Sequence, residues 1–544
     1  MRNVSTATPQ AMGVPEGRYD VVVVGAGFAG MYMLHRLRGL GFSVRVFEAG
    51  DGVGGTWYWN RYPGARCDVE SMEYSYQFSN ELQQEWEWTE RYAAQPEILK
   101  YANHVADRFD LRKDIQFNTR VTAVTFDVPT NRWTVETGDG LRTSAAFVVM
   151  ATGCLSAANV PNFPGRESFR GPWYHTGNWP HEGVDFTGKR VAIIGNGSSA
   201  VQSIPIIAQQ AAHLTVFQRT ATYAIPARNA PMDPEYQQGF KTHYPELRAK
   251  AKEGRTGLLF QVRPFGALEV SDEDRRKEFQ TRWNAGGLSF MYAFNDLLIS
   301  RKSNDTAAQF VRDRIREAVQ DPATADALSP QTVIGCKRLC IDTGYYEAFN
   351  RPNVTLIDIK DSPIEAITPS GVRVKGQEHV VDAIVFATGF DAMTGALTRI
   401  DIKGLGGRAL KEKWSEGPRT YLGLATHGFP NLFTITGPGS PSVLSNMLPS
   451  IEQHVEWVAD CIRWTRDKGF ARIEAMKSAE DEWVAHTNAI ANVTLYPSCN
   501  SWYVGANIPG KPRVFMPYLG FPAYKAKCEQ VAGSGYEGFA VTRA

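Results

Sequence analysis

The stretch DVVVVGAGFAG, residues 20–30, decides the fold. Its four consecutive valines predict a strand that is buried on both faces, as in a parallel sheet. Gly25, Gly27 and Gly30 follow in G-x-G-x-x-G spacing, and a helical segment and a second apolar strand, SVRVFEAG, come next. Glycines at this spacing permit a tight turn and let the backbone approach a pyrophosphate, whose charge the helix N-terminus favours. The stretch therefore predicts a dinucleotide-binding turn.

The same pattern recurs at residues 190–200, RVAIIGNGSSA, with Gly195, Gly197 and Ala200 at the three positions. A helical segment and the apolar strand LTVFQR follow it. Two copies in full strand–turn–helix–strand context make a chance glycine-rich turn a poor explanation.

The two copies differ at the end of their second strands. Glu48 lies 23 residues after Gly25, where a carboxylate accepts hydrogen bonds from a ribose diol. The equivalent residue of the second copy is Gln218, and Arg219 follows it. Because an arginine attracts a 2′-phosphate that a carboxylate would repel, the first turn suits FAD and the second suits NADP(H).

The rest of the chain fits an α/β fold with two Rossmann-like dinucleotide-binding domains, as in paired-Rossmann flavoproteins. The tripeptide ATG recurs at 151–153 and 387–389, each time after an apolar strand, and charged helical segments such as DTAAQFVRDRIREAVQ lie between 223 and 332. We expect a flexible tail at 1–16, an FAD-binding domain at 17–152 and 389–544, an NADP-binding domain at 153–222 and 333–388, and a mainly helical insertion at 223–332.

Composition narrows the class of protein. A net charge of +1 over 544 residues gives no general electrostatic case for binding nucleic acid or membranes. The seven cysteines are scattered, which favours free thiols in a reducing compartment over a disulfide framework or a metal site. The first 16 residues lack a secretory pattern, so we expect a cytoplasmic protein without a metal.

The segment FRGPWYHTGNWP, residues 169–180, is too rich in Gly and Pro for a helix and too irregular for a strand, so it predicts a connection between the two units. It matches F-x-G-x-x-x-H-T-x-x-W-P through Phe169, Gly171, His175, Thr176, Trp179 and Pro180. A second motif, G-G-x-W-x-x-x-x-[FY]-P-G-x-x-x-D, matches through Gly54, Gly55, Trp57, Tyr62, Pro63, Gly64 and Asp68. On these motifs the sequence resembles a single-chain Baeyer–Villiger monooxygenase, nearest the phenylacetone and steroid monooxygenase branch.

The resemblance implies that NADPH reduces FAD and that one oxygen atom of O₂ is inserted beside the carbonyl of a hydrophobic aryl, cyclic or steroid-like ketone, giving an ester or lactone. It assigns Arg338 to stabilising a flavin peroxyanion, with Asp68 as its ion-pair partner. Lys337 would hold the 2′-phosphate together with Arg219 and Thr220. By composition alone, a Lys-Arg pair is more often a solvated basic pair.

The resemblance also supplies the remaining site residues. Further cofactor contacts are expected from Phe28, Ala29, Gly55, Thr56, Trp57, Tyr74, Val121, Ser198, Ser199, Gln202, Met447 and Trp502. A substrate pocket is expected from Gln95, Cys154, Ser442, Val443 and Leu444, although Gln95 equally suits a helix start before Pro96. His175 is expected to serve a conformational role in the linker. Two departures from relatives are Asn196, where Thr is common, and the C-terminal run YLGFPAY.

The alternative that remains open is a flavin monooxygenase that oxidises sulfides or amines, because such enzymes share both glycine turns. A disulfide reductase would need a redox pair near the first turn, and it is discounted because Cys67 is the only cysteine before residue 154. A redox sensor without catalysis is the non-enzymatic alternative, and the presence of Arg338, Asp68 and both motifs argues against it. As partners we expect a small ketone and O₂, no nucleic acid or membrane, and a monomer or weak dimer.

Overall fold

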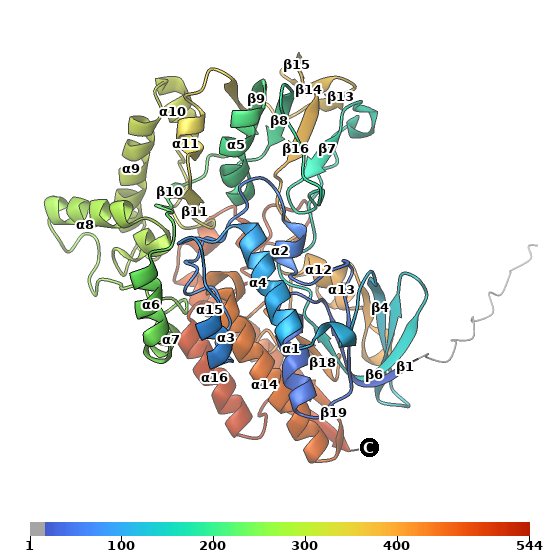
Figure 1. The fold of residues 1–544 in the computed structure, drawn as a ribbon. Coiled ribbons are helices and arrows are strands. Elements are labelled where there is room, and N and C mark those ends of the chain that lie inside the picture. The colour runs from blue at the N-terminus through green and yellow to red at the C-terminus, as the bar shows by residue number, and fades with distance from the viewer. Residues whose placement is uncertain (1–16, 544) are drawn as a thin grey trace, which may run out of the picture.

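The computed structural model describes residues 17–543, and it is built around two sheets rich in parallel strands (Figure 1). The first sheet has the order β17-β4-β5-β6-β1-β2-β3, and β18 also pairs with β6. Its strands are β1 (Gly17–Val24), β2 (Val44–Phe47), β3 (Ile115–Gln116), β4 (Val121–Asp127), β5 (Arg132–Thr137), β6 (Arg142–Met150), β17 (Asp401–Lys403) and β18 (Leu432–Thr434).

The second sheet has the order β12-β9-β8-β16-β7, with all strands parallel. Its strands are β7 (Trp173–His175), β8 (Arg190–Ile194), β9 (His213–Gln218), β12 (Val354–Asp358) and β16 (Ala383–Phe386). Short pairs and ribbons complete the strands: β10 (Ala224–Pro226) with β11 (Cys340–Asp342), β13 (Ala366–Thr368) with β14 (Gly371–Val374) and β15 (Gln377–Val380), and β19 (Phe470–Ala475) with β20 (Phe539–Arg543).

Helices cover both sheets, and Figure 1 shows α6–α10 along one side of the molecule and α14 and α16 in the lower part of the view, to the left of β1, β4 and β6. The helices are α1 (Phe28–Gly39), α2 (Thr56–Trp59), α3 (Asn80–Glu85), α4 (Gln95–Arg108), α5 (Ser198–Gln210), α6 (Pro234–Thr242), α7 (Tyr244–Glu253), α8 (Asp272–Ala285), α9 (Arg301–Ala318), α10 (Pro322–Leu328), α11 (Tyr345–Ala348), α12 (Gly395–Thr398), α13 (Leu410–Lys413), α14 (Met447–Asp467), α15 (Lys477–Asn492) and α16 (Phe521–Gly533). Among residues 17–543, no helix is long and apolar enough to cross a membrane.

Both predicted glycine turns form as the sequence indicates, and each packs against one of the ATG segments. Gly25 has φ 103°, and a Cβ on it would lie 2.6 Å from the Ala151 carbonyl oxygen. Gly195 has φ 112°, and a Cβ on it would lie 2.4 Å from the Ala387 carbonyl oxygen. A side chain is therefore excluded at both positions by the backbone of an ATG segment.

Two expectations from the sequence are wrong. The linker is not wholly irregular, because Trp173–His175 form strand β7 at the edge of the second sheet, with backbone pairing to Ile384–Phe386. The cysteines are not all free: Cys336 and Cys499 form a disulfide across 163 residues, and the other five are buried free thiols. Sequence spacing gives no pairing for cysteines so far apart, since only the folded chain brings them together.

A buried acid on α14 predicts how stability depends on pH. Glu452 is 4% exposed, and its Oε1 accepts hydrogen bonds from the backbone N–H groups of Gln77 and Phe78. Burial raises its pKa from 4.5 to about 7, with Glu456 adding to the shift. A folded-state pKa above the unfolded value stabilises the protein below pH ~4.5, and this stabilisation is lost as pH rises through ~7.

We therefore expect Glu452→Gln to flatten the fall in melting temperature of the FAD-loaded protein between pH 4.5 and 8.5. At about 1.4 kcal/mol per pKa unit, the variant gains roughly 1–3 kcal/mol over the native chain at pH 8.5 and nothing at pH 4.5. Glu416→Gln, at an exposed position, is the control. Parallel pH profiles of the Glu452 variant and the native chain would contradict the assignment.

Candidate active site

Arg338 and Asp68 form a bidentate ion pair between segments that lie 270 residues apart. Arg338 Nε donates to Asp68 Oδ2 and Nη2 donates to Oδ1, each at 2.7 Å. Nη1 donates to the Val443 carbonyl oxygen at 2.9 Å. Three donors are thus aimed by fixed acceptors, so the plane of the guanidinium is set before any ligand binds.

The ion pair keeps Arg338 charged. Burial would lower the pKa of Arg338, but the charge and hydrogen bonds of Asp68 raise it well above its ordinary value. Both side chains remain about a quarter exposed, at 26% and 27%. The site therefore presents a fixed cation that does not release a proton at neutral pH, and part of it stays accessible.

The predicted 2′-phosphate ligands gather around one cavity. Arg219, Thr220 and Lys337 line a pocket of about 550 Å³. Burial and the neighbouring Arg219 lower the pKa of Lys337. The two cations repel each other, and a bound anion would relieve this repulsion. Two further arginines, Arg301 and Arg513, line the same pocket and were not predicted from the sequence.

The glycines of the first turn pack closely against backbone. A Cβ on Gly27 would lie 3.3 Å from the Cα of Gly55, so the glycines of two motifs face each other closely. Gly30 contacts the turn even more tightly, because a Cβ there would lie 1.8 Å from the Gly25 carbonyl oxygen. Phe28 and Ala29 begin the buried first turn of α1. This backbone cradle fits the diphosphate of a dinucleotide.

Glu48 follows β2 and is held by the turn. Its Oε2 accepts a hydrogen bond from the Ala26 N–H at 2.7 Å, and its Oε1 accepts one from the Gly50 N–H at 2.8 Å. Burial raises the pKa of Glu48, while these N–H groups act against the rise. Each carboxylate oxygen keeps a further lone pair, so Glu48 retains the acceptor capacity that the predicted ribose role requires.

The aromatic residues of the second motif lie beside the first turn. Trp57 Nε1 donates to the Tyr74 hydroxyl at 3.1 Å, and the Gln95 amide donates to the Trp57 carbonyl oxygen. Thr56 begins α2, and Val121 is a buried residue at the start of β4. The sequence predicts these residues near a flavin, and in the structure the hydrogen bond between Trp57 and Tyr74 fixes the relative orientation of their rings.

The second glycine turn is open where the first is crowded. A Cβ on Gly197 would meet nothing within 4 Å, and Ser198 beside it is exposed. Ala200 is fully buried. Asn196, the residue that departs from relatives, donates from Nδ2 to Gln218 Oε1 at 2.7 Å. Its side chain therefore braces the turn against β9 and leaves the backbone free to approach a phosphate.

Helix α5 connects this turn to the two sequence motifs. Ser199 Oγ lies 3.0 Å from Thr176 Oγ1 of the linker. Gln202 accepts a hydrogen bond from the Tyr62 hydroxyl and donates one to the Arg66 carbonyl oxygen. Tyr62 was recognised only as a motif position, and in this chain its hydroxyl bonds Gln202 of α5.

One apolar cluster contains most of the predicted substrate residues. Cys154 and Val443 belong to its buried core, and Leu444, Met447 and Trp502 pack against it. Ser442, at φ +43°, lies in the same loop with its hydroxyl directed at Met393 Sδ. Tyr503, fully buried beside Arg338, is a member that no motif indicated. The cluster places apolar surface next to the guanidinium.

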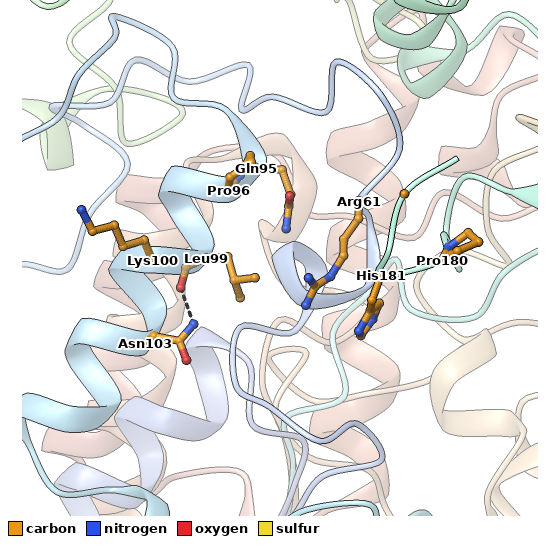
Figure 2. Close-up of a pocket in the computed structure, with 9 residues that line it drawn as sticks. Arg61, Gln95, Pro96, Leu99, Lys100, Asn103, Pro180 and His181 are labelled. Atoms are coloured by element: carbon orange, nitrogen blue, oxygen red, sulfur yellow. Dashed lines mark hydrogen bonds between the residues drawn. The ribbon is translucent and has the colours of Figure 1, made fainter. Parts of the chain in front are cut away.

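Gln95 lies elsewhere. It lines a second pocket of about 450 Å³ between α4 and the end of the linker, together with Arg61, Leu99, Lys100 and His181. Figure 2 shows these side chains around the opening, with Pro180 and His181 on the linker side. A contact between Gln95 and the substrate therefore stays a prediction.

The linker motif packs as a structural unit. Trp179 is buried beside Tyr174 and Phe186, and a Cβ on Gly171 would lie 2.3 Å from the Asp382 carbonyl oxygen. Phe169 packs against the core of the second sheet. His175 is 2% exposed, its Nδ1 accepts the Gly177 N–H at 3.0 Å, and its Nε2 lies 3.3 Å from Thr388 Oγ1.

His175 is expected to position the linker and not to transfer protons. Burial lowers its pKa to about 4, so it is neutral between pH 5 and 8. His175→Ala is expected to lower the rate of flavin reduction and the yield of oxygenated product per NADPH, with the pH profile between 5 and 8 unchanged in shape. His243→Ala, at an exposed histidine, is the control. Loss of a kinetic pKa in the His175 variant would contradict this role.

Curated relatives match nearly the whole chain, and a family model matches its N-terminal part. The family described as pyridine nucleotide-disulphide oxidoreductase matches residues 22–253. A Baeyer–Villiger monooxygenase from Pseudooceanicola batsensis is 42% identical, with 98% of each chain covered. A phenazine N-monooxygenase from Lysobacter antibioticus is 41% identical, with 96% of each chain covered.

Solved structures give the same result. An oxidised steroid monooxygenase bound to NADP is 53% identical with a TM-score of 0.92, covering 97% of this chain and 100% of its own. The OTEMO complex with FAD and NADP is 40% identical with a TM-score of 0.94, covering 97% and 100%. The resemblance found in the two motifs is confirmed, and this chain belongs to the Baeyer–Villiger monooxygenase family.

Proposed function

We propose that this protein is an NADPH- and FAD-dependent monooxygenase that inserts one oxygen atom of O₂ beside the carbonyl of a hydrophobic ketone, giving an ester or lactone. The observation that carries this proposal is the bidentate Arg338–Asp68 pair at the edge of the apolar cluster. Bound FAD would supply two-electron chemistry with NADPH and the activation of O₂.

In this proposal each group of residues has a defined task. Arg219, Thr220 and Lys337 hold the 2′-phosphate of the coenzyme, and Trp502 contacts its nicotinamide end. Arg338 offers hydrogen bonds to the negative charge that develops on oxygen beside the substrate carbonyl. An arginine suits this task because it carries charge without an acidic proton that could quench an anionic oxidant. Asp68 orients Arg338.

The apolar cluster excludes water from the reacting atoms. Val443 and Leu444 present hydrocarbon next to Arg338, while the Val443 carbonyl also fixes the guanidinium. A dry pocket strengthens the electrostatic interaction of Arg338 with charge on the substrate and limits loss of activated oxygen to water.

A second candidate function is oxygenation of a heteroaromatic or amine nitrogen, with oxidation of sulfides as a related activity. The observation that favours it is the 41% identity with a phenazine N-monooxygenase over 96% of the chain. Nitrogen oxidation needs an electrophilic oxygen, for which the fixed cation is not required in the same way. The two functions therefore differ in their dependence on Arg338.

The test is a product panel. FAD-loaded protein is incubated with NADPH and, separately, with phenylacetone, cyclohexanone, phenazine and an aryl sulfide, and products are identified by mass spectrometry. Ester or lactone from the ketones supports the proposal, and an N-oxide with no ester favours the second candidate. NADPH oxidation that yields only hydrogen peroxide on all four would reject both substrate classes.

We further propose that residues 17–152 with 389–544 bind FAD, and that 153–222 with 333–388 bind NADP. Support comes from the two sheets, each of which carries one glycine turn. The insertion at 223–332 contributes α6–α10. A cytoplasmic location and a monomer or weak dimer remain parts of this proposal.

A further inference from the structure

The Cys336–Cys499 disulfide lies in the wall of the pocket that holds Arg219, Thr220 and Lys337. Both cysteines line this pocket of about 550 Å³ together with Val333, and Leu495 packs against the small apolar cluster that these three residues form. Cys336 is 2% exposed and Cys499 9% exposed, so the bond is shielded from bulk solvent and open only to what enters the cavity.

The bond joins two segments that carry the proposed chemistry. Cys336 directly precedes Lys337 and Arg338, and Cys499 lies three residues before Trp502. The far end of the second segment is fastened separately, because Lys511 Nζ donates to Asp391 and the Ala392 carbonyl oxygen, and Asn507 donates to the Phe390 carbonyl oxygen. Opening the disulfide would therefore remove the covalent attachment of the near end of this segment while the attachments of the far end stay in place.

We propose that Cys336–Cys499 is a reversible redox site that sets the affinity of the pocket for the phosphorylated end of NADPH. The closed bond fixes a part of the wall that lines the same pocket as Arg219 and Thr220, and it tethers the backbone directly before Lys337. The open dithiol lets this wall move, so part of the binding energy is spent on ordering it. This inference rests on the proposed function, since it takes the pocket to be the coenzyme site.

The bond can be opened by a dithiol and closed again by hydrogen peroxide. A dithiol reduces the bond by thiol–disulfide exchange: the Sγ–Sγ bond breaks, two electrons and two protons reach the sulfurs, and the dithiol closes to its own cyclic disulfide. In the other direction, one thiolate attacks hydrogen peroxide to give a sulfenic acid and hydroxide. The second thiol then displaces water from the sulfenic acid, so two thiols and one peroxide give one disulfide and two waters.

A peroxide source follows from the proposed function itself. NADPH, a proton and O₂ give NADP⁺ and hydrogen peroxide whenever oxygen is activated without transfer to a substrate. The pair would thus be oxidised by turnover without ketone, next to the pocket in which the coenzyme sits.

Coenzyme binding and the redox state of the disulfide are thermodynamically linked, so the site can be tested without measuring turnover. If the closed bond favours coenzyme binding, bound coenzyme must favour the closed bond by the same factor. Coenzyme in the pocket also covers both cysteines. Saturating NADP⁺ is therefore expected to slow reduction of the bond by a small dithiol and to shift its reduction equilibrium toward the disulfide.

In the experiment, one sample of the FAD-loaded protein is denatured and its reactive thiols are counted, and NADP⁺ binding is measured on a second, native sample. We expect five reactive thiols among the seven cysteines before reduction and seven after it. We also expect that reduction weakens NADP⁺ binding by at least about fivefold, that peroxide restores the binding, and that NADP⁺ slows reduction by dithiothreitol.

Variants separate this site from other thiols. Cys499→Ser and Cys336→Ser are each expected to bind NADP⁺ like the reduced native chain and to show no response of that binding to dithiothreitol or peroxide. Cys340→Ser is the matched control, because Cys340 is a buried free thiol four residues from Cys336, and this variant is expected to keep the full response.

The proposal would be overturned if seven thiols react and treatment with peroxide does not lower this number to five. It would also be overturned if five thiols react but reduction of the bond leaves the NADP⁺ affinity unchanged. A response to dithiothreitol that persists in Cys499→Ser would also overturn it. The product panel is independent of these outcomes, so an active monooxygenase without a redox response rejects this inference alone.

Discussion

Arg338→Ala is expected to lower ester formation from a ketone by about 10²–10³-fold, the loss typical of removing a donor that stabilises developing negative charge. NADPH oxidation should continue, because the pocket lined by Arg219, Thr220 and Lys337 does not contain Arg338. The measurement is ester formed, hydrogen peroxide formed and NADPH consumed in one reaction. The expected result is NADPH consumption that yields peroxide in place of ester.

Two further variants sharpen this result. Arg338→Lys keeps the charge but loses the fork that reaches both Asp68 oxygens and the Val443 carbonyl, so a loss of ester formation close to that of the alanine variant is expected. Arg190→Ala removes another bidentate arginine–aspartate pair, with Asp382 at the surface, and serves as the control. Ester formation within twofold of the native rate in Arg338→Ala would contradict the role of Arg338.

Lys337→Ala is expected to raise KM for NADPH by about 10–100-fold and to leave KM for NADH nearly unchanged. A hydrogen bond to a charged group contributes ~1.5–3 kcal/mol, and the 2′-phosphate is the group that only NADPH carries. The measurement is kcat/KM with each coenzyme at saturating ketone. Selectivity for NADPH should fall by the same factor as its kcat/KM.

Lys360, an exposed lysine two residues after the end of β12 in the second sheet, gives the matched control Lys360→Ala. An equal rise of KM for NADPH and NADH would contradict the assignment, because it would place Lys337 on a part that the two coenzymes share. Arg219→Ala is expected to show the same selectivity loss, since Arg219 and Lys337 line one pocket.

The parts of this protein that were predictable from sequence depend on local backbone demands. Gly25 and Gly195 adopt positive φ against a carbonyl oxygen, which only glycine tolerates, so their spacing indicates the strand–turn–helix units directly. The four valines of β1 are buried as their hydrophobic run predicts. The Arg338–Asp68 pair was anticipated through family motifs, because nothing local connects residues 270 positions apart.

The remaining features depend on tertiary contacts that no local pattern encodes. The Cys336–Cys499 pairing, the Asn196–Gln218 hydrogen bond and the burial of Tyr503 beside Arg338 each join distant segments. Strand β7 was missed because its three residues have no alternating pattern and are held as a strand by pairing with β16. Such contacts appear only once the two sheets are assembled.

The most direct test of the central claim is isotopic. FAD-loaded protein is given NADPH, phenylacetone and ¹⁸O₂ in ordinary water, and the ester is analysed by mass spectrometry. If one oxygen atom of O₂ is inserted, the ester contains one ¹⁸O atom, at the new bridging oxygen between the carbonyl carbon and the migrating carbon. An ester without ¹⁸O, or the complete absence of ester while an N-oxide forms readily from phenazine, would contradict insertion of oxygen beside a ketone as the function of this chain.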